Sequence, residues 1–285
     1  MQHQLDLTQG RLRVHERGHG PVLVFLHGLL VDHELWEEVV DRLAPAHRCV
    51  ALDLPLGAHR DAMRPDADMS PRGLARLVAE ALAALELEDV TLVANDTGGA
   101  IAQLTAADHP ERLAALVLTD CDAYENFLPP VLRPLQWLAR VPALAGPMLR
   151  AGRFGPVRTA LTAPVNKRRD AERGRRWVQP LVDDAGVRRD VIKFLAAIDG
   201  SETVAAAQRL RCFDHPALII WSREDRIFPV CHAHRLAADL PDARVELVDD
   251  SRAFVPLDQP ARCVELIEAF VSQRARAQAT GAGSA

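Results

Sequence analysis

Ala94-Asn95-Asp96-Thr97-Gly98-Gly99 is the stretch of sequence that decides the fold. It follows an apolar run that starts at Val90, and it opens a helical pattern that continues to about Asp108. Small residues two positions before and two and three positions after Asp96 are typical of a sharp strand-to-helix turn that exposes its central side chain. They relieve the crowding of a strained backbone. The pattern therefore predicts a nucleophile elbow centred on Asp96. The alternative interpretation is a helix N-cap aspartate beside a glycine pair.

Short apolar runs recur on both sides of this turn. Runs without polar alternation are typical of strands that are buried on both faces of a parallel sheet. They lie at Val22–Leu26, Cys49–Leu54, Val90–Ala94, Leu116–Thr119, Ala217–Trp221 and Val245–Val248. Helical patterns separate them, including one that starts with Ser70 as N-cap and Pro71 in the first turn, and a last one from Pro260 to about Val271. This alternation predicts an α/β fold with a doubly wound, mostly parallel sheet.

The alternation stops between residues 124 and 210, where helical patterns and prolines occur without a strand-like run. We expect a helical cap there, inserted over the carboxyl edge of the sheet, where folds of this kind bind ligands. The predicted organisation is a core domain over 1–123 and 211–275, a cap over 124–210, and a flexible tail over 276–285. The basic stretch Lys167–Arg176 is expected to be an exposed face of the cap.

Composition limits the classes of function. With 48% hydrophobic residues among 285, the chain can bury a large core. A net charge of −5 argues against nucleic acid or an anionic membrane as the main partner. Five scattered cysteines without a C-x-x-C pair favour free thiols in the cytoplasm over disulfides or a zinc site. We therefore expect a cytoplasmic protein, monomeric or homodimeric, that acts on a small molecule without a cofactor or metal.

Four motifs and the absence of an elbow serine point to one family. All six serines lie outside an elbow, which disfavours a serine esterase or protease. The Asp96 elbow, Leu26-His27-Gly28, Trp221-Ser222-Arg223-Glu224-Asp225 and the closing block 250–256 (DSRAFVP) together resemble the α/β-hydrolase superfamily. The resemblance is to its aspartate-nucleophile branch, which contains haloalkane dehalogenases and epoxide hydrolases, and it covers roughly residues 10 to 272.

The resemblance implies a role for individual residues. Asp96 would attack a carbon electrophile and form an alkyl ester. The backbone N–H groups of Leu29 and Thr97 would form the oxyanion hole. Asp225 would be the triad acid, a role that Asp120 or Asp122 could share. Otherwise Asp120, Asp122 and Glu125 are expected to be solvated loop carboxylates rather than metal ligands. Residues expected to bind substrate are His27, Gly28, His33, Trp36, Trp137 and Trp177.

The family pattern is interrupted at Ala253. Relatives carry a histidine there that activates water against the ester, and loss of such a base lowers a rate by about 10²–10⁴. Three hypotheses remain open. Another histidine replaces it, with His59 favoured over His33. Alternatively, Asp96 acts as a base in a lyase, isomerase or cyclase, or the chain binds a ligand without turnover.

Two substrate-specific features of the branch are also absent. Haloalkane dehalogenases typically hold the leaving halide with an Asn or Trp after His-Gly and a Trp after the nucleophile, but Leu29 and Thr97 stand at these positions. Epoxide hydrolases typically use two cap tyrosines, and Tyr124 is the only tyrosine of this chain. The resemblance thus predicts the type of nucleophile more firmly than the leaving group.

Overall fold

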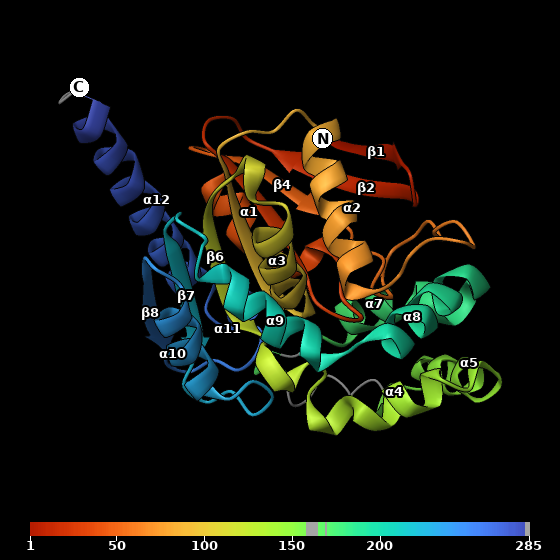
Figure 1. Ribbon diagram of the computed structural model, residues 1–285. Coiled ribbons are helices and arrows are strands. Elements are labelled where there is room, and N and C mark those ends of the chain that lie inside the picture. Colours follow the sequence, from red (N-terminus) through yellow and green to blue (C-terminus); the bar gives the residue numbers. More distant parts are fainter. Residues whose placement is uncertain (158–164, 169, 283–285) are drawn as a thin grey trace.

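The computed structural model describes residues 1–157, 165–168 and 170–282. An eight-stranded sheet forms its centre, in the order β1-β2-β4-β3-β5-β6-β7-β8 (Figure 1). Strands β3 to β8 are parallel, whereas β1 and β2 pair antiparallel with their neighbours. The strands are β1 (Gln2–Leu7), β2 (Gly10–Arg17), β3 (Val22–Leu26), β4 (Arg48–Leu52), β5 (Val90–Asp96), β6 (Leu113–Cys121), β7 (Ala217–Ser222) and β8 (Ala243–Val248). The predicted α/β class and mostly parallel sheet are confirmed.

Helices cover both faces of the sheet. One row contains α2 (Pro71–Ala84), α3 (Thr97–Asp108), α9 (Gly200–Leu210) and α10 (Val230–Asp239), and each of these helices contacts the next. On the other face, α1 (Glu37–Leu43) packs against α12 (Pro260–Ala282), with the short α11 (Val255–Asp258) beside them. Ser70 caps α2 as predicted, because its hydroxyl accepts a hydrogen bond from the Gly73 N–H at 3.0 Å.

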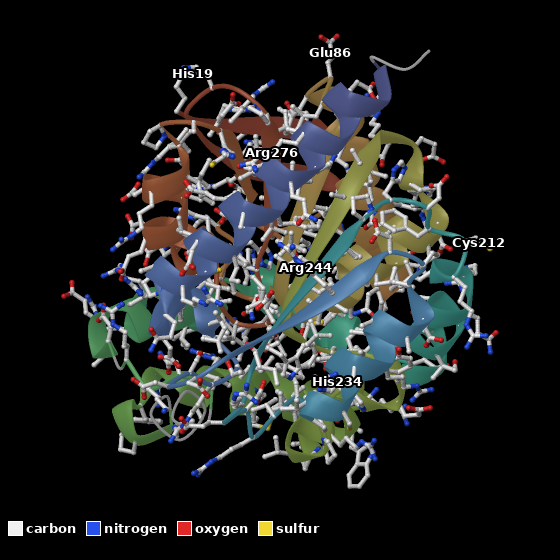
Figure 2. The ribbon with its side chains drawn as sticks, turned by 90° about the vertical axis from the view of Figure 1, so that its left-hand side faces the viewer. His19, Glu86, Cys212, His234, Arg244 and Arg276 are labelled. Atoms are coloured by element: carbon white, nitrogen blue, oxygen red, sulfur yellow. The ribbon has the colours of Figure 1, made fainter. Side chains whose placement is uncertain are left out.

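The cap follows β6. It consists of η3 (Tyr124–Asn126), η4 (Pro130–Leu132), α4 (Arg133–Ala139), α5 (Pro142–Arg150), η5 (Ala151–Arg153), α7 (Ala171–Asp183) and α8 (Ala185–Ala197). An inserted helical region is therefore confirmed. Its predicted end at residue 210 also took in α9, but that helix packs against α3 and belongs to the layer that covers the sheet. In Figure 2 the green cap helices lie at the end of the molecule opposite His19 and Glu86, beyond the carboxyl ends of the parallel strands.

Two terminal elements differ from the sequence-based expectation. The hairpin of β1 and β2 was not predicted, because these edge strands carry polar side chains on their exposed face. The last helix was expected to end near Val271 but continues to Ala282, so most of the predicted tail is helical. Its extension is rich in Ala, Arg and Gln, which favour helix, and Arg274 donates a hydrogen bond to Thr91 at 3.2 Å. Residues 283–285 lie outside the described part.

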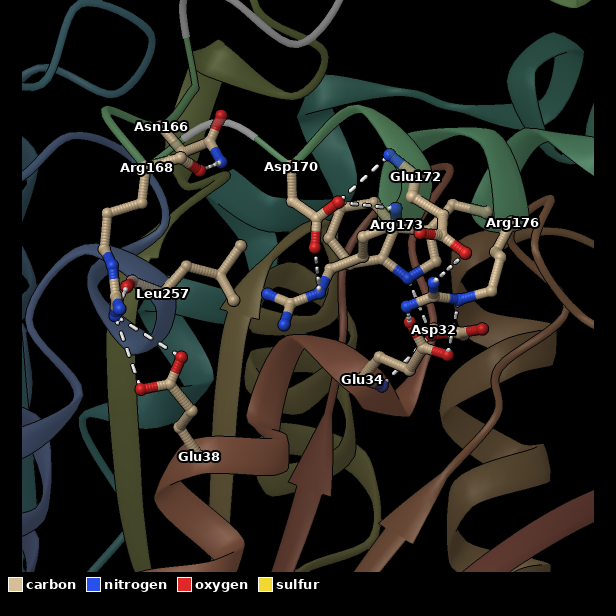
Figure 3. A network of polar contacts seen from close by, with 11 residues as sticks. Asp32, Glu34, Glu38, Asn166, Arg168, Asp170, Glu172, Arg173, Arg176 and Leu257 are labelled. Carbon is tan, nitrogen blue, oxygen red and sulfur yellow. Dashed lines mark hydrogen bonds and ion pairs between the residues drawn. The ribbon is translucent and has the colours of Figure 1, made fainter.

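Hydrogen bonds and ion pairs connect the cap to the core next to β3 (Figure 3). The Trp177 indole N–H donates to Asp32 Oδ1 at 2.8 Å. Arg176 forms an ion pair with Glu34 at 2.8 Å, and Arg168 forms one with Glu38 at 3.3 Å. The stretch Lys167–Arg176 was expected to be an exposed face of the cap. In its described part, Arg168 and Arg176 instead form ion pairs with core carboxylates. These ties fix the position of α7 over the sheet edge.

Candidate active site

Asp96 ends β5 and stands directly before α3, at φ 55° and ψ −132°. Such a positive φ is uncommon for a residue with a side chain and indicates backbone strain at this turn. Three glycines make the turn possible, because each lies where a Cβ would collide with a neighbour. A Cβ on Gly98 would strike the His27 carbonyl, one on Gly99 the Cys121 side chain, and one on Gly28 the Asp96 carboxyl group. The predicted elbow is present.

One oxygen of Asp96 already lies between two backbone donors. Asp96 Oδ1 accepts hydrogen bonds from the Leu29 N–H at 3.0 Å and from the Thr97 N–H at 2.6 Å. These are the two N–H groups predicted to form the oxyanion hole. Burial raises the pKa of Asp96, while the bonds from Thr97 and Leu29 act in the opposite direction. The site thus holds a desolvated carboxyl group with a fixed orientation.

Asp122 is a second buried carboxyl beside the elbow. The Thr97 hydroxyl donates to its Oδ2 at 3.0 Å, and its Oδ1 has no hydrogen-bond partner among the described residues. Burial and the charge of Asp96 raise the pKa of Asp122 well above its usual value. The expectation of a solvated loop carboxylate was wrong, because β6 extends to Cys121 and carries the following residue into the interior.

Asp120 and Asp225 form the acidic pair of the site. Asp120 is fully buried and accepts from the Ser222 N–H at 2.7 Å and the Ser222 hydroxyl at 3.0 Å. Asp225 Oδ1 accepts from two N–H groups of its own loop, whereas its Oδ2 is buried with no hydrogen-bond partner in the described part of the chain. Burial raises the pKa of Asp225 to about 6, and burial together with the Asp225 charge raises that of Asp120. Burial thus disfavours the charged form of both carboxyl groups.

Ala253 lies on the loop between β8 and α11 and is fully buried. Its carbonyl accepts a hydrogen bond from the Asn95 side chain at 2.8 Å, which holds the closing loop against the elbow. Asn95 also donates to Thr119 and to the Asp120 carbonyl, so it ties β5, β6 and the loop together. Sequence reasoning treated Asn95 only as part of the elbow motif and missed this role. The closing loop reaches the elbow, but residue 253 contributes only a methyl group.

His59 was the favoured substitute base, and the structure places it in a different environment. It is buried, its Nδ1 accepts from the Gly57 N–H at 3.2 Å, and its Nε2 lies 3.3 Å from Asp190 of α8. Both ring nitrogens are therefore engaged away from Asp96. His59 is better explained as a contact between the core and the cap.

His33 forms a cluster with His15 and Asp53. The two imidazole rings stack at 3.3 Å, and each places one nitrogen 2.9 Å from a different oxygen of Asp53. The ligand atoms of these three residues lie within 4.8 Å of one another. Parallel rings, however, direct their lone pairs side by side instead of toward one point, so a metal would require the rings to splay apart. As arranged, both rings donate to the Asp53 carboxylate, and the pKa of His33 is raised.

The tryptophans predicted to bind substrate lie in three different environments. Trp36 is fully buried beside Phe25 and donates to the Leu26 carbonyl at 3.2 Å, so it belongs to the core. Trp137 is 65% exposed on the cap. Trp177 is buried in the contact with Asp32. The indole N–H groups of Trp36 and Trp177 are thus bonded to Leu26 and Asp32, and Trp137 faces solvent.

His27 is fully desolvated at the end of β3. Its Nδ1 donates to the Gly28 carbonyl at 2.9 Å, and its Nε2 has no partner among the residues described. Burial lowers the pKa of His27 to about 4, so the ring is neutral at physiological pH. Its carbonyl lies against Gly98, where a Cβ would collide with it. His27 therefore supports the elbow through its backbone.

Comparisons with known proteins agree with this fold. The family model described as the alpha/beta hydrolase fold matches residues 21–260. The chain belongs to the α/β hydrolase fold family. An uncharacterized protein of Mycobacterium tuberculosis is 27% identical over 276 residues, which cover 89% of this chain and 76% of that protein. An uncharacterized hydrolase of Bacillus subtilis is 26% identical, covering 87% of this chain and 89% of its own length.

Haloalkane dehalogenases are among the similar proteins. The one from Mesorhizobium japonicum is 36% identical over 101 residues, covering 35% of this chain and 32% of the dehalogenase. The crystal structure of the enzyme from Bradyrhizobium elkani superposes with a TM-score of 0.82 at 18% identity, over 97% of this chain and 99% of that one. The second similarity shows the fold alone. In the described part of the chain, no helix combines the length and hydropathy needed to span a membrane.

Proposed function

We propose that this α/β hydrolase uses Asp96 as a covalent nucleophile on a small, mostly apolar substrate. The observation that carries the proposal is the position of Asp96 Oδ1 between the Leu29 and Thr97 N–H groups. With Oδ1 held there, Oδ2 is the oxygen directed to attack. Burial supports the same role, because a desolvated carboxylate is more reactive than a hydrated one.

The reaction proceeds in two steps. Oδ2 attacks an electrophilic carbon, the bond to the leaving group breaks, and the leaving group departs with the electron pair. The product is an alkyl ester of Asp96 whose carbonyl oxygen is Oδ1. Water then adds to Cγ, and the negative charge that develops on Oδ1 is stabilised by the two N–H groups. Collapse of this intermediate breaks the bond between Cγ and the alkylated oxygen. One proton of the added water goes to the departing oxygen, which leaves as an alcohol, and the other passes to solvent, which restores the carboxylate.

The second step lacks its usual base. Ala253, on the loop held by Asn95, stands where relatives carry the water-activating histidine, and a methyl group accepts no proton. Asp225, whose Oδ2 accepts no hydrogen bond from the described residues, stands in the position of the acid that would orient the missing imidazole. We infer that the ester forms readily and is hydrolysed about 10²–10⁴-fold more slowly than with a histidine.

The leaving group is not specified by the features that dehalogenases and epoxide hydrolases use. The side chains of Leu29 and Thr97 offer no indole or amide N–H for a halide. The Tyr124 hydroxyl donates to Asp239 at 2.9 Å, and this bond directs it away from the elbow. A second candidate function, proton transfer by Asp96 without covalent attack, is favoured by the raised pKa of Asp96.

Intact-mass spectrometry after exposure to haloalkanes and to epoxides tests the proposal. We expect one alkyl group more per chain than in the Asp96→Asn variant, because the exposed thiols of Cys212 and Cys231 can react equally in both. Asparagine is the matched control, because it tolerates a positive φ and keeps the shape of the side chain. Tight ligand binding without any adduct or turnover would contradict covalent catalysis and favour the other candidates.

A further inference from the structure

The outer surface of the cap exposes large apolar side chains. Seven such side chains are exposed in the described part of the chain, and six of them lie between residues 131 and 157. Trp137 is 65% exposed and Leu144 57%. The six are Val131, Trp137, Val141, Leu144, Phe154 and Val157. We call the surface that they form, on η4, α4, α5, η5 and the residues just after, the cap face.

The cap face is the side of α4 and α5 that the rest of the protein does not cover. α4 and α5 contact each other and α8, and they bury Ala139, Ala145 and Leu149. Figure 1 shows both helices at the lower margin of the molecule, opposite the two chain termini. Soluble proteins rarely gather this many exposed apolar side chains at one place unless the surface meets a partner or a membrane.

The charge of the cap face is of one sign. Residues 126–157, which carry the cap face, contain four arginines and no acidic residue. Arg133, Arg140 and Arg150 are exposed and form no ion pair with any described residue. This contrasts with Arg168 and Arg176, which pair with core carboxylates. The net charge of −5 for the whole chain conceals this basic surface.

A groove at one end of the cap face gathers arginines. It has a volume of about 540 Å³ and contains Arg150 of α5, Arg153 of η5 and Arg188 of α8 in its wall, with no acidic residue in the lining. Phe154 lies at the same groove, and the Arg153 guanidinium stacks over its ring at 4.6 Å. Arginines beside exposed aromatic and aliphatic groups match a bilayer interface, where phosphates meet acyl chains.

We propose that the cap face docks the protein on an anionic phospholipid bilayer, with Trp137 and Leu144 entering the interface and the arginines contacting lipid phosphates. Composition alone predicted no membrane partner; local charge reverses that expectation for this surface. A second copy of the chain fits less well, because pairing two cap faces would bring their unpaired arginines together. The inference does not depend on Asp96 being the nucleophile.

Tryptophan fluorescence offers a built-in probe. Of the four tryptophans, Trp36, Trp177 and Trp221 are buried, so Trp137 reports the environment of the cap face. Vesicles of phosphatidylcholine mixed with phosphatidylglycerol should shift its emission to the blue and protect it from acrylamide. Pure phosphatidylcholine vesicles should do so much less, and added salt should reverse the effect.

Co-sedimentation with the same anionic vesicles measures affinity in variants. Arg140→Gln should weaken binding about fivefold, the effect of one arginine near an anionic surface. Trp137→Ala should also weaken it. Arg42→Gln, which removes an exposed arginine of α1, is the matched control and should bind as the unaltered protein does. Circular dichroism melting checks that each variant is folded.

Two results would overturn the proposal. One is the absence of binding to anionic vesicles, or binding that the two cap-face variants leave unchanged. The other is a concentration-dependent dimer that Trp137→Ala abolishes without any vesicle binding, which would assign the cap face to a second copy of the chain.

Discussion

Gly28→Ala should displace the Asp96 carboxyl group, the proposed nucleophile, while leaving the fold intact. A Cβ on Gly28 would lie 2.5 Å from Asp96 Cγ, whereas ordinary contact begins at 3.4 Å. The new methyl group would also meet the Asp96 Cβ, which is fixed to the backbone, so the Asp96 turn or the Gly28 loop must shift and carry the carboxyl group with it. The carboxyl group must therefore move by about 1 Å, and a misplacement of that size lowers a reaction rate about 100-fold.

The assay is the rate of Asp96 alkylation, or of turnover, measured by mass spectrometry beside the thermal midpoint of unfolding. Gly174→Ala in α7 is the matched control, because nothing lies within 4 Å of a Cβ at that position. It should react at the rate of the unaltered protein. If folded Gly28→Ala also reacts at that rate, the reasoning about the position of Asp96 in the hole is refuted.

Two further predictions concern stability. Trp177→Phe removes the N–H group that donates to Asp32 at 2.8 Å, so the free energy of unfolding in urea should fall by about 1–3 kcal/mol. Trp137→Phe, at an exposed position, is the control and should change it by less than about 0.5 kcal/mol. Equal effects of the two substitutions would contradict a stabilising contact between Trp177 and Asp32. Burial lowers the pKa of His27 from 6.5 to about 4, so the unfolded chain binds the proton more strongly, and the stability from neutral His27 is present above pH 6.5 and lost as pH falls toward 4. The loss is about 3 kcal/mol. His27→Phe should abolish this part of the pH dependence. Urea unfolding measured against pH, with the exposed His19→Gln as the control, checks this. Identical pH profiles for the two variants would show that His27 is not the group responsible.

The sequence allowed the centre of the fold to be predicted because buried parallel strands are marked by continuous apolar runs. The runs at Val22–Leu26 and Ala217–Trp221 coincide with β3 and nearly all of β7. The elbow could also be predicted from the sequence, since only small residues fit around Asp96. The edge hairpin escaped prediction because a half-exposed antiparallel strand has no such run.

The surroundings of the elbow depended on contacts distant in sequence. Nothing local to His59 shows that Asp190, far along the chain, engages its ring. Likewise, Asp120 and Asp122 resemble loop residues until β6 is seen to extend to Cys121. Trp36 and Trp137 share one residue type but differ completely in exposure. Helical periodicity identifies apolar faces without showing which partner, if any, covers them.

Ala253→His offers the most direct test of the central claim that Asp96 attacks and the base is missing. The variant and the unaltered protein would each be alkylated, freed of reagent and followed by peptide mass mapping. We expect an ester on Asp96 in both. The ester should decay about 10²–10⁴-fold faster in Ala253→His, where an imidazole can activate water. An adduct at another residue, or rapid decay of the Asp96 ester in the unaltered protein, would contradict it.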